Sequence, residues 1–84
     1  MQKSIYTQKH RRLCELLTEA RDAAGLTQVQ VAARLGRPQS FVSKYEGGER
    51  RLDVVEFLAV TDALGIDPAA ILAELRTGLP RRKR

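Results

Sequence analysis

The chain has 84 residues, enough for one domain with a modest core and too few for a deep catalytic pocket. Its hydrophobic fraction is 43% and its formal net charge is +5. No apolar run approaches the ~18 residues that span a bilayer, and the opening MQKSIYTQKHRR lacks the apolar centre and cleavage site of a secretory signal. We therefore expect a cytoplasmic protein with no membrane partner.

The positive charge is concentrated in two parts of the chain. Residues 1–52 hold ten basic and five acidic side chains, whereas residues 53–80 hold Arg76 against five acidic ones. Residues 81–84, RRKR, form a basic tail that we expect to be disordered without a partner. This division gives a folded domain one basic face, which favours nucleic acid as the partner over an anionic membrane surface.

Apolar residues recur at helical spacing and no stretch alternates with period two, so the sequence predicts an all-α, compact domain of five helices over residues 1–80. The first helix is expected from Thr7 to Ala24, and Gly25 should end it in the left-handed conformation. Its apolar face comprises Leu13, Leu16, Leu17, Ala20 and Ala24.

Two short helices follow. The second begins at Thr27, which has capping-box spacing to Gln30, and ends at Gly36. The third is predicted over 38–46, with Pro38 in its first turn, and ends at the glycine pair 47–48. Helices of about two turns are marginal alone, so tertiary packing must hold them. The residues expected to supply that packing are Val31, Ala32, Leu35, Val42 and Tyr45.

The last two helices are predicted from cap signals and apolar faces. Asp53 and Glu56 resemble a second capping pair, and the fourth helix should end at Gly65. The fifth should begin at residues 67–68 and end at Pro80. Tyr6 and Phe57 are expected to be packing residues.

The third helix is left with a polar outward face. Amide, hydroxyl and ammonium groups of this kind can hydrogen-bond to base edges, and Phe41 is expected to face outward with them toward a thymine methyl. A solvated helix surface would look similar. The candidate base-contacting residues are Gln39, Ser40, Ser43 and Lys44.

The remaining reactive side chains form no catalytic set in the sequence. Cys14 is the single cysteine, which excludes an internal disulfide, and we expect a buried or idle thiol. His10 has no acid or cysteine companion nearby, so neither a catalytic nor a metal-binding role is expected. No nucleophile–base pair and no phosphate-cradling loop is present, and the sequence therefore predicts no enzymatic activity and no cofactor.

Three segments resemble the lambda-repressor-like, or Cro/repressor-type (XRE), helix-turn-helix DNA-binding domains. They are LTEARDAAGLTQVQVAARLG, PQSFVSKYEGGER and LDVVEFLAVTDALGIDPAAIL, and the resemblance covers about residues 13–75. It implies a helix-turn-helix over about 27–46 whose recognition helix, about 38–46, enters the major groove. The chain departs from the usual pattern at Pro38, where the family has a Ser or Thr cap, and at Phe41, which is bulkier than the usual residue.

The resemblance also implies roles for residues around the recognition helix. Gln28 would contact a phosphate and support that helix, and Arg21 would pair with Glu46. Arg50 and Arg51 lie in the loop after that helix, where they are either phosphate contacts or plain loop surface. The candidate phosphate contacts are Gln28, Arg37, Arg50 and Arg51.

The function implied is sequence-specific regulation of transcription through double-stranded DNA, in the simplest case by a repressor that binds a two-fold symmetric operator as a homodimer. The expected dimer contacts are Ile66, Leu72, Leu75 and Leu79. Two alternatives stay open. One is an antitoxin whose fourth and fifth helices hold a toxin partner and whose DNA binding is autoregulatory, and the other is a restriction–modification controller.

Overall fold

Five helices account for the regular structure of the residues that can be described. The computed structural model describes residues 2–77, with side chains from Thr7 onward. The helices are α1 (Gln2–Ala23), α2 (Gln28–Leu35), α3 (Gln39–Glu46), α4 (Val54–Leu64) and α5 (Pro68–Thr77), so the prediction of an all-α domain with five helices is confirmed. Within residues 2–77, no helix has the length and apolar character that crossing a bilayer requires.

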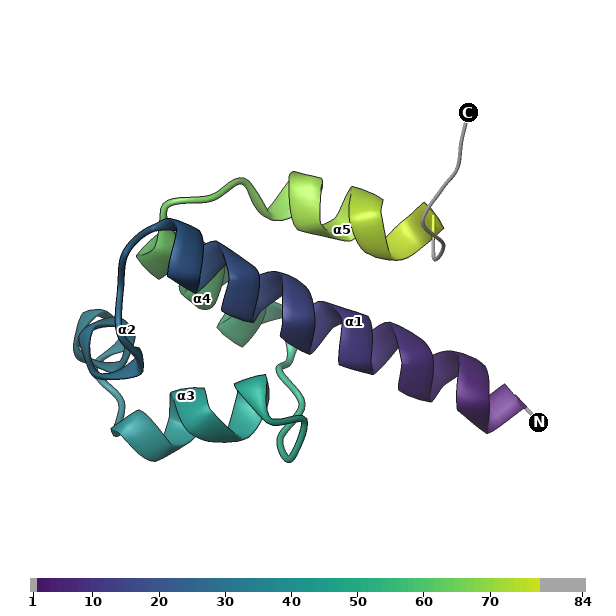
Figure 1. Ribbon diagram of the computed structural model, residues 1–84, viewed down its shortest axis with the longest axis horizontal. Coiled ribbons are helices and arrows are strands. Elements are labelled where there is room, and N and C mark those ends of the chain that lie inside the picture. Colours follow the sequence, from purple (N-terminus) through teal and green to yellow (C-terminus); the bar gives the residue numbers. More distant parts are fainter. Residues whose placement is uncertain (1, 78–84) are drawn as a thin grey trace.

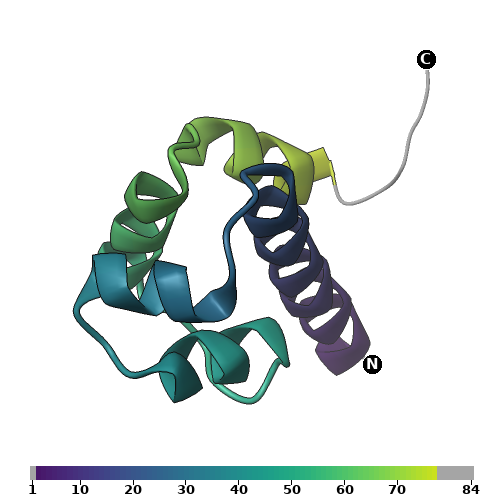
Figure 2. The same cartoon turned by 60° about the vertical axis from the view of Figure 1, so that its left-hand side comes forward.

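The long helix α1 is the element around which the others pack. It contacts α3, α4 and α5, while α2 packs against both α3 and α4. In Figure 1, α3 and α5 lie on opposite sides of α1, and in Figure 2 they lie at the bottom and the top of the molecule. A surface built on α3 is therefore separate from a surface built on α5.

Helix α1 is longer than its apolar pattern predicts. It begins at Gln2 rather than Thr7, because residues 2–6 contain neither glycine nor proline to stop it. Pro38 is the N-cap of α3, with φ −67° and ψ 155°, and not a residue of its first turn. The expected end of α5 at Pro80, the packing of the Tyr6 side chain and the tail 81–84 lie outside what the structure describes.

Local hydrogen bonds begin α2 and α4 as the sequence predicts. Thr27 Oγ1 accepts from the Gln30 N–H at 3.1 Å, and the Gln30 side chain accepts from the Thr27 N–H at 2.9 Å. Asp53 and Glu56 repeat this exchange at 2.7 and 3.0 Å. Each capping box satisfies backbone donors that the first helical turn leaves unpaired.

A tight turn at Gly36 joins α2 to α3. Its φ of +67° lies in the left-handed region, which glycine enters without steric cost. The Arg37 N–H then donates to the Ala32 carbonyl at 3.0 Å, which closes the end of α2. Gly25 ends α1 in the same conformation, with φ +72°, as predicted.

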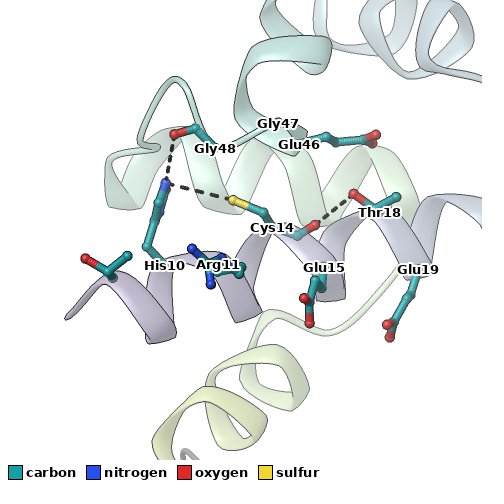
Figure 3. Close-up of a pocket in the computed structure, with 10 residues that line it drawn as sticks. His10, Arg11, Cys14, Glu15, Thr18, Glu19, Glu46, Gly47 and Gly48 are labelled. Carbon is teal, nitrogen blue, oxygen red and sulfur yellow. Dashed lines mark hydrogen bonds between the residues drawn. The ribbon is translucent and has the colours of Figure 1, made fainter. Parts of the chain in front are cut away.

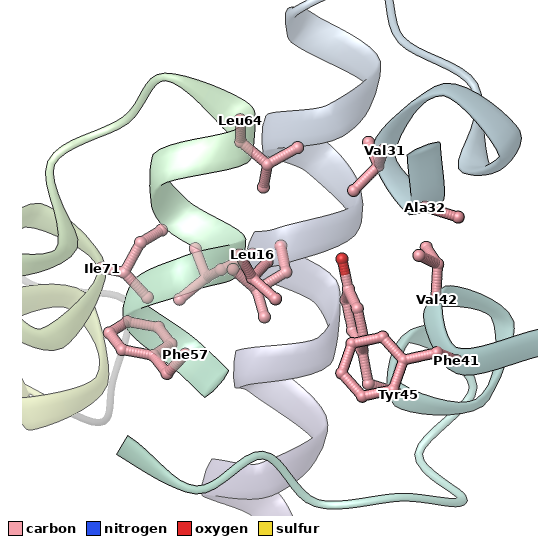
Figure 4. Packing of buried hydrophobic residues seen from close by; sticks show 11 residues of the cluster. Leu16, Val31, Ala32, Phe41, Val42, Tyr45, Phe57, Leu64 and Ile71 are labelled. Carbon is pink, nitrogen blue, oxygen red and sulfur yellow. The ribbon is translucent and has the colours of Figure 1, made fainter. Parts of the chain in front are cut away.

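The core lies where α2, α3 and α4 meet α1 (Figure 4). Val31, Ala32, Val42 and Tyr45 are buried as expected, and Leu35 packs against the core from its edge. The prediction that Phe57 is a packing residue is confirmed as well, since its side chain is buried.

The prediction that Phe41 faces outward is wrong. Its side chain is only 7% exposed, and its ring meets the Tyr45 ring edge to face, with centroids 5.5 Å apart. The two residues are four apart and share one face of α3. Phe41 therefore belongs to the core, and the polar face of α3 is narrower than the sequence suggested.

Candidate nucleic-acid interface

The outward face of α3 consists of polar side chains. The exposed residues include Gln39, Ser40, Ser43 and Lys44, whereas the apolar residues of the helix are buried. A helix turns about 100° per residue, so positions 39, 40, 43 and 44 fall on one continuous strip. The structure thus brings all four candidate base-contacting residues together on one solvent-facing surface.

A chain of hydrogen bonds runs beneath this strip. Gln39 Nε2 donates to Gln28 Oε1 at 3.2 Å, and Gln28 Nε2 donates to Glu46 Oε1 at 3.0 Å. Gln28 therefore links the first residue of α3 to the last from its place in α2. Gln39 keeps its carbonyl oxygen and one amide hydrogen, which are the two groups that an adenine edge pairs with.

The hydrogen-bond chain ends at a largely buried ion pair. Arg21 Nε donates to Glu46 Oε2 at 2.7 Å and Arg21 Nη2 donates to Glu46 Oε1 at 3.1 Å. The Glu46 side chain is 6% exposed and that of Arg21 15% exposed. The hydrogen bonds to Glu46 raise the pKa of Arg21 above its ordinary value. The structure therefore brings together the two residues that the family resemblance pairs.

A second charged cluster holds Arg37 and Arg50, two of the candidate phosphate contacts. Arg50 donates from Nη1 and Nη2 to the two carboxylate oxygens of Glu56, both at 2.9 Å, and Arg37 Nη2 donates to Glu56 Oε2 at 3.2 Å. The guanidinium carbons lie 4.1 Å (Arg37) and 4.8 Å (Arg50) from the centroid of the Phe41 ring. The hydrogen bonds from Arg50 are the main reason that the pKa of Glu56 falls to about 2.

The sequence alone does not reveal this cluster. Glu56 was identified only through its capping-box spacing to Asp53, a local signal that says nothing of more distant partners. Arg51, beside Arg50, has an exposed side chain, while its backbone carbonyl accepts from Arg50 Nη1 at 2.9 Å. The four candidate phosphate contacts therefore differ: Arg51 faces solvent, and the other three are engaged within the protein.

An open pocket of about 430 Å³ lies between α1 and the end of α3 (Figure 3). The expectation that His10 has no cysteine companion is wrong, because its Nε2 lies 3.9 Å from Cys14 Sγ and 3.4 Å from the Gly48 carbonyl oxygen. Residues four apart face each other on a helix, and this spacing was the signal overlooked. Cys14 is buried, as predicted, and burial raises the pKa of its thiol. In the described residues no group of three or more metal-ligating side chains occurs.

The candidate dimer contacts are only partly exposed. Leu72 is half exposed, whereas Ile66 and Leu75 pack against the core, and Leu79 lies outside the described residues. Apolar side chains with a greater exposed fraction lie on α4, where Val54 is 73% exposed and Val55 is 76% exposed. They were missed because α4 is apolar on nearly every face, so its sequence does not distinguish the buried side from the exposed one.

Comparison with known proteins identifies the family. The profile of a helix-turn-helix domain family matches residues 12–75. An XRE-family like protein from Pseudomonas syringae pv. tomato str. DC3000 is similar, with a TM-score of 0.87 and 54% identity over 93% of this chain and 95% of that one. No curated protein sequence matches the chain.

Two further solved structures are similar. The restriction-modification controller protein C.AhdI from Aeromonas hydrophila has a TM-score of 0.67 and 33% identity over 71% of this chain and 91% of that one. The clp gene regulator ClgR from C. glutamicum has a TM-score of 0.76 at 22% identity, over 88% and 96% of the two chains, and so shows a shared fold. The family profile and the identity to the Pseudomonas protein show that this chain belongs to the lambda-repressor-like XRE family of helix-turn-helix DNA-binding proteins.

Proposed function

We propose that this DNA-binding regulator is a repressor that binds a two-fold symmetric operator in double-stranded DNA and acts in the cytoplasm. The observation that carries the proposal is the exposed polar strip on α3, which is supported from beneath by Gln28 and Glu46. A supported helix keeps its side chains in fixed positions, which reading of a base sequence requires. Occupation of an operator by a compact domain blocks transcription without any chemical step.

The residues of the interface fall into two groups. We assign base contacts to Gln39, Ser40, Ser43 and Lys44, because these side chains share the exposed strip. We assign phosphate contacts to Gln28, Arg37, Arg50 and Arg51, which lie around α3. Contacts to phosphates position the protein on DNA but do not distinguish one base from another. Arg51, with its exposed side chain, is the strongest member of the second group.

We further propose a homodimer that forms through the exposed apolar side chains of α4 and α5. Leu58 and Ile66 line one shallow hollow there. Val55 on α4 and Leu72 on α5 add exposed apolar area. Leu75 and Leu79 are the remaining candidates. Because α5 and α3 lie on opposite sides of α1, pairing on the α5 side leaves the recognition helix free (Figure 1). Two subunits would then read half-sites about 10 base pairs apart.

Two other biological settings suit the same DNA-binding activity. The similarity to the controller C.AhdI favours control of a restriction–modification operon. The exposed Val54 and Val55 on α4 equally suit a toxin partner, in which case DNA binding would be autoregulatory. A partner of different sequence bound at α4, in place of a second copy of this chain, distinguishes the antitoxin from the other two.

Selection of bound sequences from a random duplex pool tests the proposal. We expect a single enriched motif with two inverted half-sites about one helical turn apart. An enriched motif without inverted repeats would contradict the symmetric operator, and no enrichment at all would contradict sequence-specific binding. Co-purification with a small protein that masks α4 would favour the antitoxin.

A further inference from the structure

The contacts of Glu56 reproduce the way in which arginine binds phosphate. Arg50 presents two N–H groups to two oxygens of one anion, at 2.9 Å each, and Arg37 adds a third bond at 3.2 Å. This parallel fork is the geometry that guanidinium groups use for carboxylates and phosphates alike. A DNA phosphate would therefore compete with Glu56 for the same donors.

The cluster lies beside the face that is proposed to bind DNA. Phe41, on which both guanidiniums stack, is three residues before Lys44 and thus about 60° from it around α3. Arg37 directly precedes the helix, and its side chain is 41% exposed. The guanidinium of Arg37 is therefore near the edge of the recognition surface and open to solvent.

Glu56 holds its two arginines unequally. Arg50 makes two bonds to the carboxylate and a third to the Arg51 carbonyl, whereas Arg37 makes one bond, and it is the longest in the cluster. Four hydrogen bonds saturate the carboxylate, since the Asp53 N–H also donates to Oε1 at 3.0 Å. Arg37 is thus the donor that a phosphate can withdraw with the smallest loss of internal contacts.

We propose that Glu56 is an internal competitor for DNA phosphate, which restrains Arg37 and so limits binding that is independent of base sequence. The proposal rests on the proposed function, in which the α3 face meets DNA. Log affinity falls as log salt concentration rises, and each phosphate that the protein neutralises makes this slope steeper by about 0.9. With Glu56 in place, Arg37 contributes much less than this; without the carboxylate it contributes in full.

The test compares Glu56→Gln with Glu49→Gln on a random duplex across a salt series. Both variants remove one negative charge near the α3–α4 loop, but the exposed Glu49 accepts no hydrogen bond from either arginine. We expect Glu56→Gln to bind at least about threefold more tightly than Glu49→Gln, with a slope steeper by about 0.9. In an Arg37→Ala background, this difference should shrink by the share of Arg37, and any remainder belongs to Arg50, which also loses the carboxylate.

Two results would overturn the restraint. One is equal behaviour of the two Gln variants, and the other is a difference that Arg37→Ala does not diminish. If Glu56→Gln does not fold, the Arg37→Ala variant is compared with wild type in the same salt series. A salt slope shallower by the full ~0.9 contradicts restraint of Arg37, and a change well below ~0.9 supports it. Wild-type protein that binds no duplex at any salt concentration overturns the proposed function itself, and the restraint with it.

Discussion

Arg21 and Glu46 stand 25 positions apart and join the end of α1 to the end of α3 through two hydrogen bonds of 2.7 and 3.1 Å. The same carboxylate receives Gln28, so three helices meet at one charge. Because the Glu46 side chain is almost entirely buried, its charge depends on these partners for compensation. The position of α3 therefore depends on a polar contact as well as on the apolar core.

Glu46→Gln should destabilise the domain strongly. The change removes the buried anion from the largely buried guanidinium of Arg21, which keeps only the exposed carboxylate of Asp22 at 3.5 Å, and the loss of a fully buried partner costs ~3–5 kcal/mol. In a domain of this size, each ~1 kcal/mol lowers Tm by roughly 4–8 °C. Glu15→Gln is the matched control, since its ion pair with Arg12 is exposed and contributes less than ~1 kcal/mol. Similar melting temperatures for the two variants in calorimetry would mean that the Arg21–Glu46 pair contributes little.

Phe41→Ala should destabilise the domain by ~3–5 kcal/mol, because it removes a buried ring that contacts Tyr45 and two guanidinium groups. Ser40→Ala, one position earlier on the exposed strip, should change stability by less than ~0.5 kcal/mol. Chemical denaturation of both variants measures the difference. Near-equal free energies of unfolding would be inconsistent with a buried Phe41.

Base-contacting and phosphate-contacting residues should separate in a binding assay. Gln39→Ala and Lys44→Ala should each weaken binding to the selected site by ~1–3 kcal/mol while binding to random duplex stays nearly constant, because a base contact matters only where its base is present. Arg51→Ala should weaken binding to both duplexes alike and reduce the salt slope by about 0.9. Fluorescence anisotropy across a salt series gives both quantities. Uniform weakening by every α3 variant would argue against base reading by this helix.

The stabilising contribution of Glu56 should disappear in acid. Its pKa is about 2 in the folded protein, against an ordinary value of 4.5. A lowered folded-state pKa stabilises the fold above the unfolded-state value, and this contribution is lost as pH falls from about 5 toward 2. The Tm difference between wild type and Glu56→Gln should therefore be larger at about pH 7 than at about pH 2.5. Glu49→Gln serves as the control, and an equal change in that variant would show that the effect is not specific to Glu56.

Leu58→Asp should convert the proposed homodimer to a monomer. The substitution places a charge in the hollow that Leu58 shares with Ile66, and a charge at the centre of an apolar interface has no compensating partner. Val29→Asp is the control, because Val29 is an exposed apolar residue on α2, away from the proposed interface. Light scattering at tens of micromolar distinguishes the states. Wild-type protein that is monomeric under those conditions would contradict the dimer.

The sequence by itself determined the features that depend on neighbouring residues. Thr27 with Gln30 and Asp53 with Glu56 begin their helices through contacts within one turn, and Gly36 ends α2 through its own backbone conformation. Apolar spacing predicted the buried sides of α2 and the place of Tyr45 in the core. Such local signals suffice for the number and order of helices, and with the family resemblance they predict that α3 is the recognition helix.

Only the tertiary structure decided which residues from distant segments meet. The Phe41 ring is buried because Tyr45 and the guanidiniums of Arg37 and Arg50 contact it. The two arginines, which stand before and after α3 in the chain, both donate hydrogen bonds to Glu56. Of these five residues, Arg37, Phe41 and Tyr45 are spaced four apart, but no spacing in the sequence joins Arg50 and Glu56 to them. Their contacts arise because α3 and α4 both pack against α1 and α2, a property of the whole core, and no short segment of the chain carries that information.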